Sequence, residues 1–281
     1  MLRRTMFAIG SFLLVFATCS AAQAPAEKSA AVDTLVKKVA GPISKSKMKS
    51  IVVVGFSGPG KTVTDLGTIL RDEVSDALAR QLSDVKVIDR AAIDAMLKQN
   101  RVSEGMLYNA SMGDWIATHV HADGYVTAHF EVPESGPSPV TIEIFKCGAE
   151  SCSRMGVPIV TEMTLNAKEF LASGQGFTQT INSAAFEPDQ NGVTHPRCIS
   201  CANPSYTDEA RKLKINGKLL MVVTVEADGS TNDIFIEQPL GHGLDGAAID
   251  GVLKWKFEPA VDANGHAVAT HVQLEVSFSL K

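Results

Sequence analysis

The segment Gly55–Thr62 carries the most recognisable chemical pattern in the chain. Gly55, Gly60, Lys61 and Thr62 satisfy the G-x-x-x-x-G-K-[ST] signature, in which backbone N–H groups cradle phosphates and the lysine reaches them. The segment follows an apolar run and precedes an amphipathic stretch, the strand-to-helix context that such a loop needs. This motif therefore predicts nucleotide binding as one candidate function of the chain.

Two features oppose this interpretation. Pro59 removes one N–H donor from the loop. The aspartate that would hold magnesium, Asp89, follows a strand that Lys86 interrupts. The alternative is a glycine-rich turn between a strand and a helix, without a ligand.

Histidines could bind a metal, and the tight group of them is His119, His121 and His129. His119 and His121 would share one face of an extended segment, as metal ligands can. Asp123 is near, but no other carboxylate or cysteine has ligand spacing, so we expect no metal and no cofactor. We also find no catalytic triad order, paired-carboxylate signature or dinucleotide fingerprint, so we expect no enzymatic activity and no catalytic residues.

The N-terminus has the pattern of an export signal. Arg3 and Arg4 precede the apolar stretch Met6–Ala17, and small and polar residues follow. Cleavage after Ala22 would release the protein into the periplasm. Two alternatives stay open: lipid attachment at Cys19, and an uncleaved inner-membrane anchor, although the apolar stretch is shorter than the ~20 residues that span a bilayer comfortably.

Export determines how the remaining cysteines are interpreted. Cys147, Cys152, Cys198 and Cys201 form an even set in an oxidising compartment, which predicts the disulfides Cys147–Cys152 and Cys198–Cys201. A redox-active CxxC pair or half of a zinc site are the alternatives for Cys198 and Cys201. Covalent haem attachment is excluded, because Ala202 stands where a histidine is required.

Composition and charge restrict the class of partner. With 281 residues, 45% of them hydrophobic, the chain can form one large or two small packed domains. Its net charge of −5 does not suit nucleic acid, which requires a basic face, so no nucleic-acid partner is expected.

The patterning divides the chain into five segments. We expect a signal peptide at 1–22, a tether at 23–45, an α/β domain at 46–172, a linker with the CxxC motif at 173–203, and a C-terminal domain at 204–281. In the first domain an apolar strand, Ile51–Val54, is followed by an amphipathic helix, Asp65–Leu82, and strands and helices continue to alternate. The whole chain is therefore predicted to be α+β.

The C-terminal segment has the clearest periodicity. Val268–Leu280 alternates apolar and polar residues, as a strand with one buried face does. Strands Lys218–Glu226 and Asn232–Glu237 are joined by Asp228 and Gly229, a hairpin turn. With helices at Thr207–Leu213 and Leu244–Trp255, this predicts a three-stranded antiparallel sheet that helices cover on one face.

Residues 204–281 resemble the TonB C-terminal family. The matching motifs are, in order, Pro204–Tyr206, Glu209–Arg211, Gly217, Val225 with Asp228 and Gly229, Gly241–Asp245 with Ala247 and Ala248, Trp255–Ala260, Gly265 and Phe278. Thr207, and Pro239 with Leu240, depart from common family residues, which loosens kinship with the energy-transducing members. Structurally, Trp255 and Phe257 are expected to seat the second helix on the sheet, and Pro259 to end it.

The resemblance implies a way of binding. TonB-like domains capture an extended peptide of an outer-membrane partner as an added strand, with backbone bonds giving affinity. The implied receiving edge is Val268, Ala269, Thr270, His271, Val272, Gln273, Leu274 and Glu275. The alternative is that this edge is covered or pairs with a second copy as a homodimer. Motor coupling is not favoured, because no histidine precedes His119 and no proline-rich spacer is present.

The first domain resembles, over short motifs, the α/β domain of CsgG- and FlgO-like outer-membrane proteins and the TolB N-terminal domain. The motifs are Ile51–Phe56, Leu66–Gly67, Val87–Arg90 and Ala122–Val126. Together these features favour a periplasmic, TonB-family binding protein connected with outer-membrane transport. A P-loop nucleotide-binding protein and an envelope scaffold protein are the alternatives.

Overall fold

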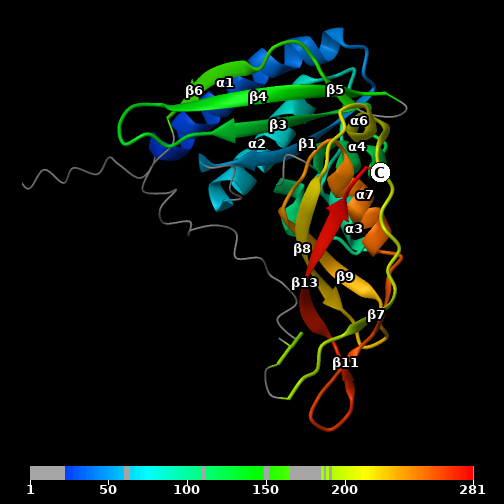
Figure 1. Cartoon of the computed structure of the whole chain (residues 1–281). Helices are drawn as coiled ribbons and strands as arrows, with labels where there is room; N and C mark the ends of the chain where they lie inside the picture. The colour runs from blue at the N-terminus through cyan, green and yellow to red at the C-terminus, as the bar shows by residue number, and fades with distance from the viewer. Residues whose placement is uncertain are drawn as a thin grey trace, which may run out of the picture.

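The computed structural model describes residues 23–280, apart from 60–63, 109–111, 149–151, 165–184, 187, 190 and 191. The expected signal peptide and the phosphate-loop residues Gly60, Lys61 and Thr62 lie outside the described residues. The chain is α+β, with a six-stranded sheet in the first domain and a three-stranded sheet in the C-terminal domain (Figure 1).

The first domain is built on a mixed sheet. Its strand order is β2-β1-β3-β4-β5, and β6 also pairs with β4. β1 pairs in parallel with β2 and β3, while the remaining pairs are antiparallel. The strands are β1 Ser50–Ser57, β2 Lys86–Val87, β3 Gly124–Phe130, β4 Ser138–Cys147, β5 Cys152–Arg154 and β6 Ile159–Met163.

Helices cover both faces of this sheet, which explains why β1 is a continuous apolar run. Ile51 and Val53 enter a core with α1 and α2, whereas Val52 and Val54 enter a second core with α3, η2 and α4. The helices are α1 Gln23–Lys45, α2 Asp65–Gln81, α3 Arg90–Gln99, the 3-10 helix η2 Glu104–Tyr108, and α4 Gly113–His119.

The prediction of a tether at residues 23–45 is wrong, because this segment forms α1. Leu35, Val39 and Ile43 repeat at helical spacing and are fully buried in the core beside α2. The alanine, lysine and serine content concealed an apolar face, to which Val32, Val36 and Ala40 also belong, and this face packs the helix on the sheet.

The C-terminal sheet has the order β13-β8-β9 and is antiparallel throughout, as predicted. Its strands are β8 Gly217–Val225, β9 Thr231–Gln238 and β13 Thr270–Phe278, and its helices are α6 Asp208–Lys212 and α7 Leu244–Val252. Gly229 forms the β8–β9 turn with φ of 76°, where a Cβ would lie 2.0 Å from the carbonyl oxygen of Phe257. Glycine is therefore required there for both backbone conformation and space.

Four short strands extend the C-terminal domain: β7 Arg197–Ser200, β10 Lys256–Glu258, β11 Ala260–Val261 and β12 Ala267–Val268. The prediction that the second helix reaches Trp255 and is ended by Pro259 is wrong, because α7 ends at Val252. Phe257 lies in β10 instead, opposite Cys198 of β7. Pairing with a distant segment thus replaces the last turn of the predicted helix.

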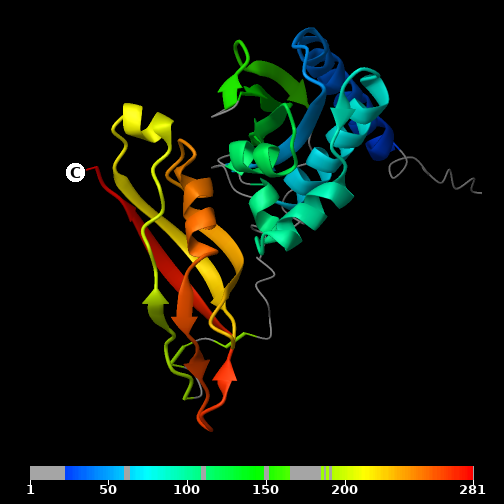
Figure 2. The ribbon, with the colours of Figure 1, turned by 90° about the vertical axis from the view of Figure 1, so that its right-hand side faces the viewer.

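One hydrophobic core runs through both domains. It joins Val52 and Trp115 of the first domain with Met221, Ile234 and Ala248 of the C-terminal domain. Figure 2 shows the C-terminal domain as a narrow body beside the first domain. Within the described residues, no helix combines the length and apolar character needed to cross a membrane.

Candidate partner-binding edge

β13 is an edge strand whose outer side is open over most of its length. β13 pairs with β8 from Thr270 to Phe278. At its start, the N–H of Phe186 donates to the carbonyl oxygen of Ala269 (2.9 Å), and the N–H of His271 donates to the carbonyl oxygen of Phe186 (3.0 Å). These bonds identify the side of β13 that faces away from β8.

Because backbone groups alternate between the two sides of a strand, the N–H and C=O groups of Gln273, Glu275 and Ser277 face the same outer side as those of His271. Within the described part of the chain, no segment pairs with that side beyond His271. We call the backbone from Val272 to Ser277 the β13 edge. It offers donors and acceptors to an added strand.

Side chains give the β13 edge two different faces. On one face Gln273 and Glu275 are exposed; Gln273 donates to Glu237 (2.6 Å), and Lys218 forms an ion pair with Glu275 (2.8 Å). On the other face Val272 and Leu274 are half-buried against the core. An added strand would therefore meet a polar row on one face and an apolar row on the other.

The structure distributes the eight residues of the predicted receiving edge between two environments. Val268 belongs to β12 and pairs with Ala260. Phe186 lies opposite Thr270 and forms backbone hydrogen bonds with Ala269 and His271. The remaining residues, Val272, Gln273, Leu274 and Glu275, lie on the β13 edge, which continues beyond them to Ser277.

The opposite edge of the sheet, on β9, is occupied by the first domain. The N–H of Ser103 donates to the carbonyl oxygen of Ile234 (3.1 Å), and the N–H of Ile234 donates to that of Arg101 (3.2 Å). Val102 and Ile234 thus form a parallel bridge. The N–H of Ile236 points at the sulfur of Met106 (3.1 Å). The first domain thus covers β9 at Ile234 and Ile236, whereas in the part of the chain that the structure describes the β13 edge stays uncovered.

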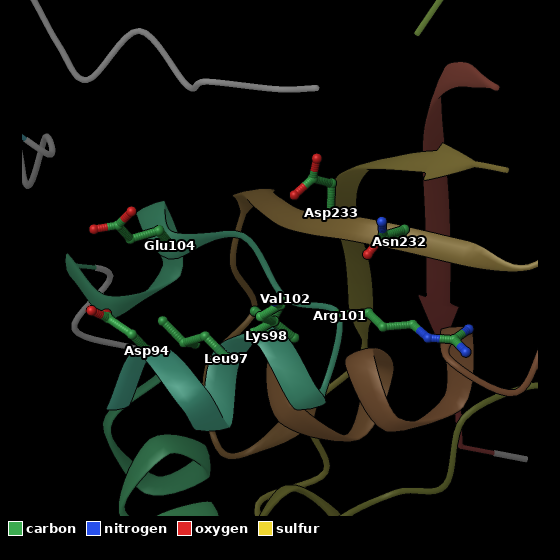
Figure 3. A pocket seen from close by; sticks show the side chains of 8 residues that line it. All are labelled: Asp94, Leu97, Lys98, Arg101, Val102, Glu104, Asn232 and Asp233. Atoms are coloured by element: carbon green, nitrogen blue, oxygen red, sulfur yellow. The ribbon is translucent and has the colours of Figure 1, made fainter. Parts of the chain in front are cut away.

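A polar cleft of about 330 Å³ marks this junction between α3 and β9 (Figure 3). Asp94 and Glu104 line it from the first domain, and Arg90 forms ion pairs with both of them. Asn232 and Asp233 line it from β9. Arg90 offsets only part of this acidic charge, and Lys98 and Arg101 also line the cleft, so its mixed charges do not indicate one class of ligand.

Trp115 of α4 contacts α7 of the C-terminal domain directly. Its indole N–H donates to a carboxylate oxygen of Asp250 on α7 (3.0 Å), and its ring stacks on His119 at 4.0 Å. A Cβ at Gly246 would lie 2.6 Å from the Trp115 ring. Glycine at this position therefore allows α7 to approach α4 closely.

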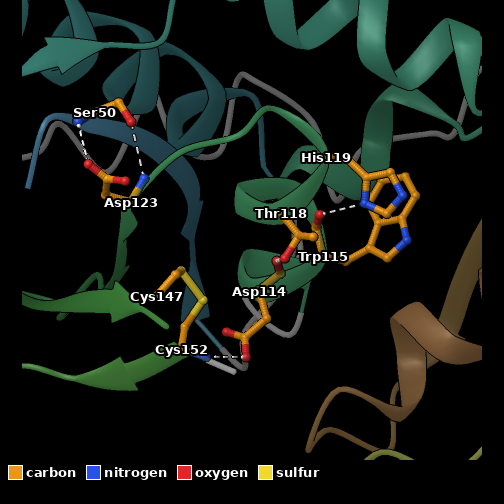
Figure 4. The surroundings of a disulfide bond; sticks show 8 residues. All are labelled: Ser50, Asp114, Trp115, Thr118, His119, Asp123, Cys147 and Cys152. Carbon is orange, nitrogen blue, oxygen red and sulfur yellow. Dashed lines mark hydrogen bonds between the residues drawn. A yellow bond between two sulfur atoms is a disulfide. The ribbon is translucent and has the colours of Figure 1, made fainter. Parts of the chain in front are cut away.

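The disulfide Cys147–Cys152 joins β4 to β5 next to α4 (Figure 4). The backbone N–H of Cys152 donates to the carboxylate of Asp114 (3.3 Å), and the hydroxyl of Tyr125 also donates to it. Burial nevertheless raises the pKa of Asp114 above its ordinary value, outweighing these bonds. Burial also raises the pKa of Tyr125, so its hydroxyl stays a donor at physiological pH.

The second expected disulfide, Cys198–Cys201, is also present. Cys198 lies on exposed strand β7, opposite Phe257, and the indole N–H of Trp255 donates to the carbonyl oxygen of Ala202 just beyond the bridge (2.8 Å). The bridge closes a local loop at the end of β7, while pairing with β10 and the bond from Trp255 attach this segment to the C-terminal domain. Because the sulfurs are paired with each other, this CxxC is not half of a zinc site in the structure.

The phosphate-loop pattern is only partly described. Gly55 lies inside β1 with φ of 44°, at an irregularity in the pairing with β3. Phe56 and Ser57 continue the strand opposite Ala128 and His129. A phosphate loop would need these residues as turning backbone with free N–H groups, so the described half of the motif does not favour nucleotide binding.

The histidines of the tight group have separate roles. His119 ends α4 and is not in an extended segment; His129 pairs with Glu131 (2.6 Å). Asp123 accepts backbone N–H groups at the start of β1, including that of Ser50 (3.2 Å; Figure 4). Over the described ranges, no group of three or more potential ligands is placed to hold a metal ion.

Comparison with known proteins bears on the C-terminal domain. Residues 202–280 match the family model described as the Gram-negative bacterial TonB protein C-terminal. These residues are therefore similar to the TonB C-terminal family, as the sequence motifs indicated. A Protein TonB of Xanthomonas campestris pv. campestris (strain B100) is 33% identical over 78 residues, which are 27% of this chain and 34% of that protein. The chain thus spans about a third of the length of this curated relative.

Solved structures are also similar to parts of the chain. The solution structure of the Pseudomonas aeruginosa TonB CTD has 23% identity and a TM-score of 0.28, covering 35% of this chain and 97% of that chain. The LpoB C-terminal domain from Escherichia coli has 14% identity and a TM-score of 0.34, covering 43% of this chain and 87% of that chain.

The sequence did not indicate that the first domain closes β9. The contact at Ile234 uses backbone groups of Arg101 and Ser103, so no side-chain pattern predicts it. Arg101 (φ 55°) lies in the turn after α3, and Asp233 (φ 49°) lies in β9 where the register with β8 shifts, but neither residue type is specific for such a conformation.

Proposed function

We propose that the chain is a periplasmic binding protein that captures an extended segment of an envelope or outer-membrane protein by adding it as a strand to the β13 edge. The observation that carries this proposal is the asymmetry of the C-terminal sheet. The β9 edge is bonded to Arg101 and Ser103, whereas the β13 edge has outward backbone groups at Gln273, Glu275 and Ser277. Among the described residues, the open edge that the C-terminal sheet offers to a partner strand is therefore that of β13.

The chemistry of this edge also specifies the partner segment. Backbone bonds, each worth about 1 kcal/mol net, supply affinity that does not depend on the partner sequence. Selectivity comes from alternate side chains, which would lie beside half-buried Val272 and Leu274 on one face. The segment should therefore alternate apolar and polar residues. We propose a binding role without catalysis, linked to outer-membrane transport as in the TonB family.

A proline at Glu275 tests the proposal directly. The Glu275 N–H faces outward, so Glu275→Pro removes a donor from the β13 edge and leaves the bonds to β8 in place. Glu275→Ala is the matched control, because it also loses the ion pair with Lys218 but keeps the N–H. Circular dichroism would verify that both variants are folded.

The assay places a photo-crosslinking amino acid at exposed Ser277 and identifies the adducts formed in the cell envelope. We expect adducts with a small set of envelope proteins for the parent and for Glu275→Ala, and their loss for Glu275→Pro. Equal adducts in all three proteins would refute strand addition. Adducts with twice the mass of the chain would show instead that the edge pairs with a second copy.

A further inference from the structure

The first domain contains an apolar groove that the peptide-binding role does not use. Its volume is about 510 Å³, and it lies between the C-terminal end of α1 and strands β4 and β6. Apolar side chains form its walls: Ile142, Ile144, Met155, Val157 and Ile159. A groove of this size and character is within the range of small-molecule sites, about 300–1,000 Å³.

The groove exists because α1 ends before the sheet does. Farther along β6, α1 covers the sheet: Lys38 donates to the hydroxyl of Thr161 (2.7 Å), and Met163 is buried. In Figure 1, α1 runs behind β4 and β6 in this way. Toward the β5–β6 turn the cover stops, so Ile159 is only half-buried and Val157 is 83% exposed.

The segment at the C-terminal end of α1, which borders the groove, is rich in lysine. Residues 34–49 contain five lysines, Lys37, Lys38, Lys45, Lys47 and Lys49, and no aspartate or glutamate. Lys45 lines the groove itself. Glu143 of β4 points to the opposite face of the sheet from Ile142 and Ile144, where it pairs with Arg154 (2.6 Å). An anionic group at the groove would therefore meet Lys45 and no carboxylate from β4.

We propose that this groove binds a long-chain fatty carboxylate, with the acyl chain along Ile142, Ile144 and Ile159 and the carboxylate next to Lys45. The basic end and apolar walls match the two ends of such an amphiphile. A protein partner fits less well, because a stable interface uses about 20–30 residues on each side, whereas nine residues line this groove. The proposal does not depend on the β13 edge.

Chain length provides the first test. Carboxylates of increasing length would be titrated into the full chain by calorimetry, below their critical micelle concentrations. Each buried methylene should strengthen binding about fourfold, until the groove is filled and the affinity levels off. Affinity that does not change with chain length would overturn the proposal.

Two valines three residues apart, Val157 and Val160, provide matched variants. Val157→Asp places a charge in the wall of the groove, at a side chain that is 83% exposed and so costs little stability. Val160→Asp makes the same change at a 62% exposed site on the other face of β6, opposite Thr141. We expect Val157→Asp to weaken binding at least tenfold and Val160→Asp to leave it unchanged. Equal affinities for the two variants would overturn the proposal.

The headgroup is tested with Lys45→Met, which keeps the aliphatic stem and removes the charge. The parent should prefer a carboxylate over the alcohol of equal length by about two- to fivefold, and Lys45→Met should bind both equally. An unchanged preference would remove Lys45 from the site. Binding to anionic phosphatidylglycerol vesicles, without binding to the monomeric carboxylate, would replace the proposed ligand with a membrane surface and overturn the proposal.

Discussion

Gly246 provides a quantitative test of the contact between the two domains. In an isolated helix, replacing glycine with alanine stabilises by up to about 1 kcal/mol. In this protein the new Cβ would lie 2.6, 3.0 and 3.1 Å from three atoms of Trp115. Overlap of this kind costs about 1–3 kcal/mol. We therefore expect Gly246→Ala to lower the free energy of unfolding by about 1–2 kcal/mol.

The sign of the effect should reverse when the indole is absent. Trp115→Ala alone should cost about 3–5 kcal/mol, since the ring is buried. In that background, Gly246→Ala should become neutral or stabilising, which gives a coupling energy of about 2 kcal/mol in a double-mutant cycle. Gly41 of α1 is the control position, because a Cβ there meets no atom within 4 Å. Gly41→Ala should have the same small effect in both backgrounds.

Urea unfolding followed by circular dichroism measures all of these variants, without relying on the fluorescence of the residue that is removed. If Gly246→Ala has the same effect with and without Trp115, then α4 and α7 do not touch in solution. The account of one core shared by both domains would then be refuted.

Three further outcomes are expected. The raised pKa of Asp114 contributes stability at low pH, and this contribution is lost as the pH rises through the pKa of the folded state. Over that pH range, the free energy of unfolding of the parent should fall relative to that of Asp114→Asn. A difference in urea unfolding that stays constant with pH would contradict this. Gly229→Ala should destabilise far more than Gly265→Ala in thermal unfolding, because both have positive φ but only Gly229 meets a backbone carbonyl. Replacing both cysteines of Cys147–Cys152 with alanine should cost about 2 kcal/mol in denaturant unfolding, and no change would contradict a structural role for the bridge.

The sequence predicted those elements whose signals are local. The alternation along Val268–Leu280 and the turn at Asp228 and Gly229 each depend on neighbouring residues, and the structure confirms the strand-and-hairpin sheet that they indicated. The short segment at Val268 is the exception, since it separates as β12 to pair with Ala260. The residue pattern alone cannot distinguish a continuous strand from one that changes partner.

Elements decided by distant contacts were not predicted. The last turn of the helix toward Trp255 gives way because β10 pairs with β7, more than fifty residues earlier in the chain. The sequence predicts a tether in place of α1, because the surrounding alanine, lysine and serine residues obscure the helical spacing of Leu35, Val39 and Ile43. For the candidate site, the strand was predicted, but its open length depends on contacts made by Phe186 and Ser103 through backbone atoms.

The closure of β9 has a consequence for any study of the C-terminal domain in isolation. A fragment that begins after the first domain would lose its lateral neighbour at Ile234 and expose the apolar side of α7 to water. Such a fragment has two unpaired sides, and two identical copies could satisfy each other there. Dimers of the fragment would then result from removal of the first domain. In the intact protein, the preceding domain covers these surfaces and so protects them from such pairing.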